Sequence, residues 1–342
     1  MKLSAALRKG RLAATTAGAA ALMAGCSSDS PSMLDGHGHE ANRVAGDWWL
    51  MFGLATAVYV VVAGMVIFAV LRGRRRTAPA AIAGEDAATT KRDNGFVVVG
   101  GIVVPALILA VLAVVTVTTT NGVRQRQGDA VKITVRGERW WWDVQYAGGV
   151  RGANEVHVPV GRQVDITLRS DNVIHSFWVP QLAGKVDLVP GQVNHLRLTA
   201  TKAGTYRGQC AEFCGIQHAH MIFYVIAQEP ADFQRWLTRR SSGAGTAPES
   251  DDAAQGQRIF QRETCAGCHT VAGTTAQGKV GPDLTGFGQR RTIGAGTVPN
   301  DAGRLKQWVQ DSQTIKPGNL MPPSHLSDDD LRRLVAYLES LG

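Results

Sequence analysis

The sequence predicts a multi-domain membrane protein that consists of a two-helix transmembrane hairpin, an all-β domain and an all-α domain. Two long apolar runs without charge, 48–71 and 96–119, predict the hairpin. Short β-type runs separated by glycine, proline and asparagine follow from residue 131 and predict the β domain. Helical segments at 256–262 and 331–338 predict the last domain. The 342 residues leave room for two or three domains, so all three parts fit.

Residues 1–25 are typical of a signal peptide. A basic start is followed by an alanine-rich apolar run and then by L-M-A-G-C. This last string resembles a bacterial lipobox, in which Cys26 becomes the lipidated first residue of the mature protein. Met23 is an unusual occupant of that box, so a plain signal peptide cleaved near Ala24 is the alternative. Residues 26–46 are polar and rich in glycine, and we interpret them as an N-terminal linker.

Residues 47–120 predict the transmembrane hairpin. At about 1.5 Å per residue, each apolar run is long enough to cross a bilayer. Trp48 and Trp49 suit the membrane interface, and basic residues flank the loop between the two runs. Such residues mark the cytoplasmic side, so both globular parts are expected on the periplasmic or outer face of a bacterial cell membrane. Pro105 lies in the second span, where neighbouring helices can satisfy the carbonyl that a proline leaves free.

The net charge of +8 does not indicate a nucleic-acid partner. Much of the positive charge lies at the extreme N-terminus and next to the apolar runs, where it reports membrane topology. The residues beside the runs are Arg72, Arg74, Arg75, Arg76, Lys91 and Arg92.

The soluble part divides into three segments. Short strands place the β domain at 129–230, as a sandwich or barrel. A short amphipathic helix and a polar Gly/Ser/Pro-containing linker occupy 231–252. The helical domain follows at 253–342.

The stretch Q-C-A-E-F-C-G-I-Q-H-A-H-M, residues 209–221, predicts a copper site. Cys210, Cys214, His218 and Met221 are soft or borderline ligands of the kind that copper prefers. Zinc sites do not normally use methionine. Two thiolates so close together could bridge two metal ions, with one more imidazole from elsewhere, and His175 is the candidate. The alternatives are buried core cysteines or a disulfide, which would leave the neighbouring histidine and methionine without a role.

The string C-A-G-C-H predicts covalent haem attachment in the helical domain. Cys265 and Cys268 would form thioethers to the haem vinyl groups, and His269 would bind the iron. A redox-active dithiol and half of a zinc site are the alternatives. Two later strings, G-P-D-L-T-G and K-P-G-N-L-M-P-P, favour haem because they follow at the spacing of haem cytochromes.

From about Asp47 to Trp236 the chain resembles subunit II of the haem–copper cytochrome c oxidases. Three strings carry the resemblance: residues 209–221, here called the copper loop, H-S-F-W-V-P from His175, and K-V-D-L-V-P-G-Q-V-N from Lys185. It implies a cupredoxin-like Greek-key fold and a dinuclear copper centre, CuA. In that family two cysteines bridge both coppers, each copper takes one histidine, and a methionine and a backbone carbonyl complete the shells. The residues at these positions are Cys210, Cys214, His175, His218, Met221 and the carbonyl of Glu212.

The resemblance also assigns roles near the copper loop. The side chain of Glu212 falls where the family contacts a magnesium ion at the border with subunit I. Trp140, in R-W-W-W, falls at the tryptophan through which electrons reach CuA. Two positions depart from the family pattern. Asn172 stands where an aspartate is frequent, and the carboxylate often found about two turns before Pro105 is missing.

The helical domain resembles the class I cytochromes c. The resemblance makes Met321 the sixth iron ligand, and it makes Pro282 the acceptor of a hydrogen bond from His269. Ligation by methionine and histidine raises the reduction potential.

Together these motifs imply subunit II of an oxidase with a fused cytochrome c domain, the caa3 arrangement. Electrons would pass from a donor through haem c to CuA and on to haem a of subunit I, coupled to reduction of O2 to water and proton translocation. The oxygen site would belong to subunit I. Expected partners are subunits I and III, the lipid membrane, and a donor such as a cytochrome c or a cytochrome bc complex.

Two rival functions stay open. One is a membrane-anchored electron-transfer protein with CuA and haem c that serves another terminal reductase. The other is a copper-storage or assembly protein, which would not need a covalent haem.

Overall fold

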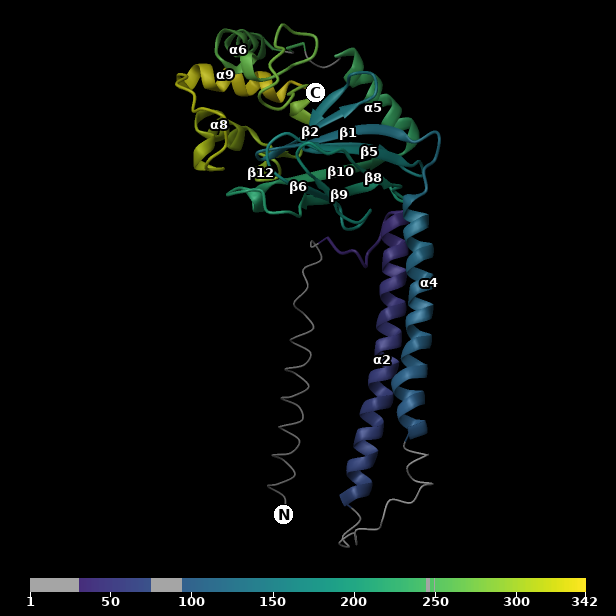
Figure 1. Ribbon diagram of the computed structural model, residues 1–342. Coiled ribbons are helices and arrows are strands. Elements are labelled where there is room, and N and C mark those ends of the chain that lie inside the picture. The colour runs from purple at the N-terminus through teal and green to yellow at the C-terminus, as the bar shows by residue number, and fades with distance from the viewer. Residues whose placement is uncertain (1–30, 75–93, 244–246, 249) are drawn as a thin grey trace, which may run out of the picture.

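The computed structural model describes residues 31–74, 94–243, 247–248 and 250–342. The predicted signal peptide, Cys26, and most of the basic residues between the two apolar runs lie outside these ranges. A long helical hairpin extends from one side of a β domain, and a helical module packs beside the same domain (Figure 1).

The hairpin consists of α2 (His39–Arg74) and α4 (Val104–Arg124), with a π-helical segment, η1 (Val99–Val103), directly before α4. By length and composition, helices 39–74 and 94–124 could each cross a membrane. Pro105 lies in the first turn of α4. Because proline cannot donate a backbone hydrogen bond, the wider π-helical turn just before it accommodates the break in the bonding pattern.

The start of α2 differs from the predicted polar linker, because residues from His39 onward are helical. Glu40 is buried, and its carboxylate accepts a hydrogen bond from the Thr199 amide at 2.9 Å. The His37 amide donates to the carbonyl of Gln181 at 2.7 Å. These contacts join the hairpin to the β domain, so the polar residues here are part of the fold.

The β domain consists of two five-stranded sheets with strand orders β3-β2-β1-β5-β8 and β4-β10-β9-β6-β7. The first sheet contains β1 (Val131–Glu138), β2 (Trp141–Tyr146), β3 (Arg151–Ala153), β5 (Val164–Ser170) and β8 (Asn194–Leu198). The second contains β4 (Glu155–Pro159), β6 (His175–Trp178), β7 (Val186–Leu188), β9 (Gly204–Cys210) and β10 (Ile222–Gln228). The pairs β1–β5 and β4–β10 are parallel and the others antiparallel, so the chain crosses between the sheets repeatedly.

An aromatic cluster fills the space between the sheets near the copper loop. The rings of Trp142, Phe177 and Phe223 lie 4.1–5.5 Å apart between centroids, and all three side chains are fully buried. Buried residues alternate with more exposed ones along β1 and β10, as expected for strands with one face on a core. This packed core gives the loops at the strand ends a rigid support.

Helix α5 (Pro230–Ser242) closes one end of the β domain. Its Trp236 ring stacks on the buried His157 imidazole with centroids 4.0 Å apart. The helix ends at Gly243, whose φ of 66° is a left-handed conformation that favours glycine.

The helical module contains α6 (Asp251–Arg262), α7 (Cys265–Cys268), α8 (Ala302–Gln310) and α9 (Asp328–Glu339). It also contains two short antiparallel strands, β11 (Thr292–Ile293) and β12 (Val298–Pro299), of two residues each. Helices α6 and α9 cross in close contact. Gly256 makes this possible, because a Cβ there would collide with the backbone of Arg333. Ser250 and Ser327 cap the two helices.

Hydrogen bonds donated by backbone amides join the helical module to the β domain. The Ile222 amide donates to the carbonyl of Ala295 at 2.9 Å. The Arg291 amide donates to the buried carboxylate of Glu155, also at 2.9 Å. The module therefore has a defined docked position, in addition to its covalent link through residues 243–250.

Candidate copper and haem sites

Two neighbouring strands bring the copper-loop residues together. Cys210 is the last residue of β9, and Phe177 of β6 pairs with it, which places His175 beside it. The amide of Cys210 donates to the carbonyl of Met221 at 3.0 Å and closes the loop between β9 and β10. The Ala211 amide donates to the carbonyl of Ser176 at 3.0 Å and ties the loop to β6.

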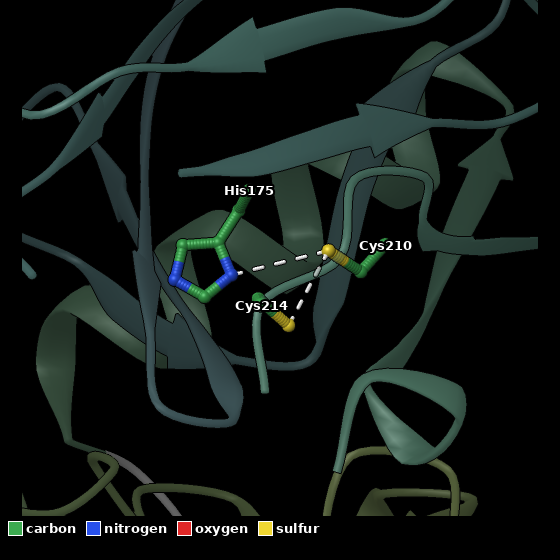
Figure 2. A group of neighbouring side chains, drawn as sticks. All are labelled: His175, Cys210 and Cys214. Atoms are coloured by element: carbon green, nitrogen blue, oxygen red, sulfur yellow. Dashed lines mark hydrogen bonds between the residues drawn. The ribbon is translucent and has the colours of Figure 1, made fainter. Parts of the chain in front are cut away.

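The sulfur atoms of Cys210 and Cys214 are 3.8 Å apart, and the His175 ring lies beside them (Figure 2). Three predicted side chains and one backbone carbonyl lie close to these two sulfurs. Cys210 Sγ lies 3.9 Å from His175 Nδ1 and 3.2 Å from the carbonyl oxygen of Glu212. Cys214 Sγ lies 3.7 Å from His218 Nδ1 and 3.8 Å from Met221 Sδ. The sulfur separation is well above the ~2.05 Å of a disulfide, and both thiols are free.

Burial and charge favour a metal between these thiols. Cys210, Cys214 and Met221 are buried. A hydrogen bond from Cys214, opposed by burial, lowers the pKa of Cys210 to about 3. The same hydrogen bond, together with burial, raises the pKa of Cys214. Thiolates rather than thiols are metal ligands, so a metal cation bound here would take the place of the thiol protons.

The donor set fits copper. Among the described residues, His175, Cys210 and Cys214 form the one group of three candidate metal ligands whose atoms all lie within 4.8 Å of one another. Two thiols, two imidazoles, a thioether and a carbonyl surround this point, and thiolate and thioether are soft donors. The aromatic core behind them limits solvent access.

The orientation of His175 is set by Asn172. His175 is fully buried, and its Nε2 lies 3.1 Å from Asn172 Oδ1. Because an amide oxygen can only accept, Nε2 carries the hydrogen and Nδ1 is free to face the sulfurs. Asn172 Nδ2 in turn donates to the carboxylate of Glu138 at 2.9 Å. Sequence reasoning found the asparagine and missed Glu138, which no motif distinguishes.

Glu212 presents its two polar groups to different surroundings. Its carbonyl faces Cys210, whereas its carboxylate lies 3.8 Å from the ammonium of Lys185 on the surface. Among the described residues, no group of three clustered metal ligands includes this carboxylate.

The three tryptophans of the R-W-W-W run have different surroundings. Trp142 is fully buried in the core, and Trp141 is half-buried. Trp140 packs over the copper loop, and its Nε1 donates to the carbonyl of Cys214 at 2.8 Å. Gly215 has a φ of 116°, and a Cβ there would lie 3.0 Å from the indole of Trp140. Glycine at this position thus lets the copper loop lie against Trp140.

The haem-attachment residues line a cavity of about 540 Å³. The ring of His269 is held by a 2.8 Å hydrogen bond between Nδ1 and the carbonyl of Pro282, which leaves Nε2 as the free nitrogen. Met321 lies on the lining of the same cavity, and its amide donates to Asn319 Oδ1 at 2.8 Å. The cavity also contains the two cysteines of α7, and its walls include Val280, Leu284, Phe287, Leu320 and Leu334. A largely apolar cavity of this size, with two thiols and two candidate iron ligands on its lining, fits a covalent haem.

Residues of both modules line this cavity. Arg139, Trp140 and Trp141 of the β domain contribute to its wall. Lys316 is also on the lining, although sequence reasoning considered its segment only for Met321. The predicted copper site and the predicted haem site are thus separate but adjacent. Trp140 contacts both, because it lines the cavity and donates to the carbonyl of Cys214.

The comparisons with known proteins agree with this division. A family model described as "Cytochrome C oxidase subunit II, periplasmic domain" matches residues 149–228, and one described as "Cytochrome c" matches residues 253–342. Together with the helical hairpin, these matches confirm the predicted fold class.

Relatives match over part of their length. Cytochrome c oxidase subunit 2 of Alkalihalophilus pseudofirmus is 40% identical over 215 residues, which is 62% of each chain. The Bacillus subtilis protein of the same name is 34% identical over 225 residues, 62% of this chain and 63% of that one. The chain thus matches less than two thirds of the length of these relatives. Among solved structures, the periplasmic domain of the Bradyrhizobium japonicum subunit II is 28% identical, with a TM-score of 0.33, over 34% of this chain and 96% of that one.

Proposed function

Since the chain is homologous to cytochrome c oxidase subunit II over 62% of its length and carries a cytochrome c domain at its C-terminus, we propose that it is the electron-accepting subunit of a haem–copper oxidase. Electrons pass from a donor to haem c, then to CuA, and then to haem a of subunit I. The observation that carries this proposal is the convergence of His175, His218, Met221 and the Glu212 carbonyl on the two thiols, within 3.2–3.9 Å.

The copper-loop residues hold the centre in this proposal. Cys210 and Cys214 would hold the coppers through their thiolates, His175 and His218 through Nδ1, and Met221 and the carbonyl of Glu212 would complete the set. A dinuclear copper centre, when bound, supplies one-electron chemistry. The protein's contribution is orientation, because β6 and β9 fix the buried ligands on a packed core that leaves little room for rearrangement.

The helical module holds haem c in the same way. Cys265 and Cys268 would attach it covalently, and His269 and Met321 would hold the iron. The hydrogen bond to the carbonyl of Pro282 fixes the plane of the His269 ring and increases its basicity.

Trp140 connects the two sites in this proposal. Its ring belongs to the wall of the haem cavity, and its Nε1–H is bonded to the carbonyl of a bridging cysteine, Cys214. Electrons leaving the haem reach the copper loop through this indole.

The membrane hairpin and the surface charges extend the proposal to partners. Helices α2 and α4 anchor the chain in a bacterial cell membrane, with the globular parts on the outer face. Subunit I binds next to the copper loop, where the exposed carboxylate of Glu212 contributes to a magnesium site. Subunit III completes the complex, which reduces O2 to water and translocates protons, while the oxygen site belongs to subunit I.

Purification of the membrane complex tests this function. The expected optical spectrum shows haem c and haem a together, with two coppers in this chain and a mixed-valence electron paramagnetic resonance signal. Cys214→Ser and His218→Asn should each abolish that signal. His220→Asn is the matched control, because this histidine lies in the same loop and its Nδ1 is bonded to Gln217 at 2.9 Å.

Two outcomes would contradict the proposal. One copper per wild-type chain, or a normal two-copper signal in Cys214→Ser, would remove the copper assignment. Co-purification with a reductase that lacks haem a would favour the rival electron-transfer protein that serves another terminal enzyme.

A further inference from the structure

The side chain of Lys316 is buried between the helical module and the β domain. The residue is 2% exposed, and its ammonium donates to three backbone carbonyls, those of Trp140 at 2.9 Å, His220 at 2.7 Å and Gly294 at 2.7 Å. All three N–H donors are therefore used. No carboxylate of the described residues lies within ion-pair distance of Lys316, so its partners are carbonyls alone.

The three carbonyls come from the parts that must be held together. The indole ring of Trp140 packs over the copper loop, and His220 belongs to the short 3-10 turn of that loop. Gly294 belongs to the helical module and lines the haem cavity. One ammonium thus joins the copper loop, the connecting tryptophan and the haem cavity.

The residues after Lys316 strengthen the same contact. Gln217 of the copper loop donates to the carbonyl of Pro317 at 2.6 Å. Gly318 has a φ of 81° and packs so closely on Ile216 that a Cβ would lie 2.5 Å from its side chain. The segment 316–318 therefore lies against the copper loop, and Met321 follows it in the haem cavity.

A buried ammonium is expensive unless its acceptors are fixed in place. The acceptors of Lys316 belong to two modules, so they are together only when the modules are docked. Since Lys316 and Gly294 both belong to the helical module, undocking would separate the ammonium from the carbonyls of Trp140 and His220. The buried ammonium of Lys316 therefore has all of its hydrogen-bond acceptors only in one relative position of the helical module and the β domain.

We propose that Lys316 is a positioning residue that holds the helical module on the β domain, with the haem cavity against Trp140. Electron transfer from haem c to CuA then occurs within one fixed arrangement, without movement of the module on its linker. The kinetic part of this inference rests on the proposed function, whereas the docking itself does not.

Hydrogen–deuterium exchange on the full-length holoprotein tests the docking. The amides of Ile222 and Arg291 donate across the interface, so they report docking directly. Lys316→Met, which keeps an unbranched side chain one atom shorter and removes its three donors, should speed exchange of both amides at least tenfold. Lys306→Met is the matched control. Its ammonium lies on the surface of the same module, 3.0 Å from Asp328, and its loss should leave both amides unchanged.

Flash-induced electron transfer from haem c to copper gives the second readout. In Lys316→Met the rate should fall at least tenfold and become dependent on solvent viscosity, whereas the haem potential and the copper resonance signal stay the same. Lys316→Gln, which can reach fewer carbonyls, should give a smaller change in the same direction and serves if the methionine variant does not fold.

Three results would overturn the proposal. Unchanged amide exchange in both Lys316 variants would show that docking does not depend on this residue. An unchanged transfer rate would show that positioning is not limiting. The absorption band of the bond between the haem iron and the Met321 sulfur could be lost while the interface amides stay protected from exchange. That result would show that Lys316 only supports the loop that carries Met321. If the chain binds no copper, the proposed function fails, and the exchange experiment still decides the docking.

Discussion

Gly137→Ala is expected to disturb the copper site through a single methyl group. Gly137 lies in β1 opposite the ring of His175, and a Cβ there would lie 2.7 Å from Cδ2 and 3.0 Å from Cγ of that ring. Ordinary van der Waals contact begins at 3.4 Å, so the ring would have to move by 3.4 − 2.7, about 0.7 Å. His175 is fully buried between Trp142 and Asn172, and this leaves little space for such a movement.

The expected cost follows from overpacking. Adding carbon to a packed core destabilises by about 1–3 kcal/mol. Alanine in place of glycine in a strand returns roughly 0.5–1 kcal/mol through the lower entropy of the unfolded chain. We therefore expect a net loss of about 0–2.5 kcal/mol in the copper-free protein. Because the displaced ring is a copper ligand in the proposed site, copper affinity should fall about 10- to 100-fold, as for other disturbed ligand supports.

Gly152→Ala is the control for this substitution. Gly152 also lies in a strand, β3, but the nearest atom to its Cβ would be the carbonyl oxygen of Glu155 at 3.9 Å. Denaturant unfolding of the copper-free chain and copper titration followed by electron paramagnetic resonance measure both effects. If Gly137→Ala matched Gly152→Ala in stability and in copper affinity, the ring of His175 would not be confined as argued.

Two further predictions concern the haem ligand and the pH dependence of stability. Met321→Ala should keep the covalent haem and lower its reduction potential, because the thioether ligand is lost; an unchanged potential in a redox titration would exclude Met321 as a ligand. Burial lowers the pKa of His157 from 6.5 to about 4, so the unfolded chain binds more protons between these values, and stability is full above pH 6.5 and falls toward pH 4 by up to about 3 kcal/mol. His157→Gln should flatten this slope in urea unfolding from pH 7 to 4, and a slope equal to that of the wild type would contradict the assignment.

The copper and haem motifs could be predicted from the sequence because their residues are close together along the chain. Residues 210–221 form one loop between two strands, so their spacing already limits where the ligands can lie. Residues 265–269 are similarly local. His175 is 35 residues from Cys210 along the chain. The need for one more imidazole made it a candidate, and the resemblance to a known family added support, but spacing along the chain could not place it at the copper loop.

The contact between the modules could not be predicted in this way. Lys316 is 176 residues from Trp140, and its acceptors are backbone carbonyls, which every residue possesses. A hydrogen bond to the backbone leaves no pattern of side-chain types in the sequence. The burial of Glu40 was missed for the same reason, because its partner is the amide of Thr199.

The docked position of the helical module depends on its interface more than on its linker. Doubling the length of a flexible connection changes the entropy of closing it by only about 0.6 kcal/mol. Each hydrogen bond to a charged group contributes about 1.5–3 kcal/mol. Lys316 makes three of them, and the two to the carbonyls of Trp140 and His220 cross between the modules. A linker alone would bring the haem near the copper in many orientations, of which few place the cavity against Trp140. The interface selects one of these orientations, so the efficiency of the proposed transfer is encoded in residues 316–318 and in the copper loop that receives them.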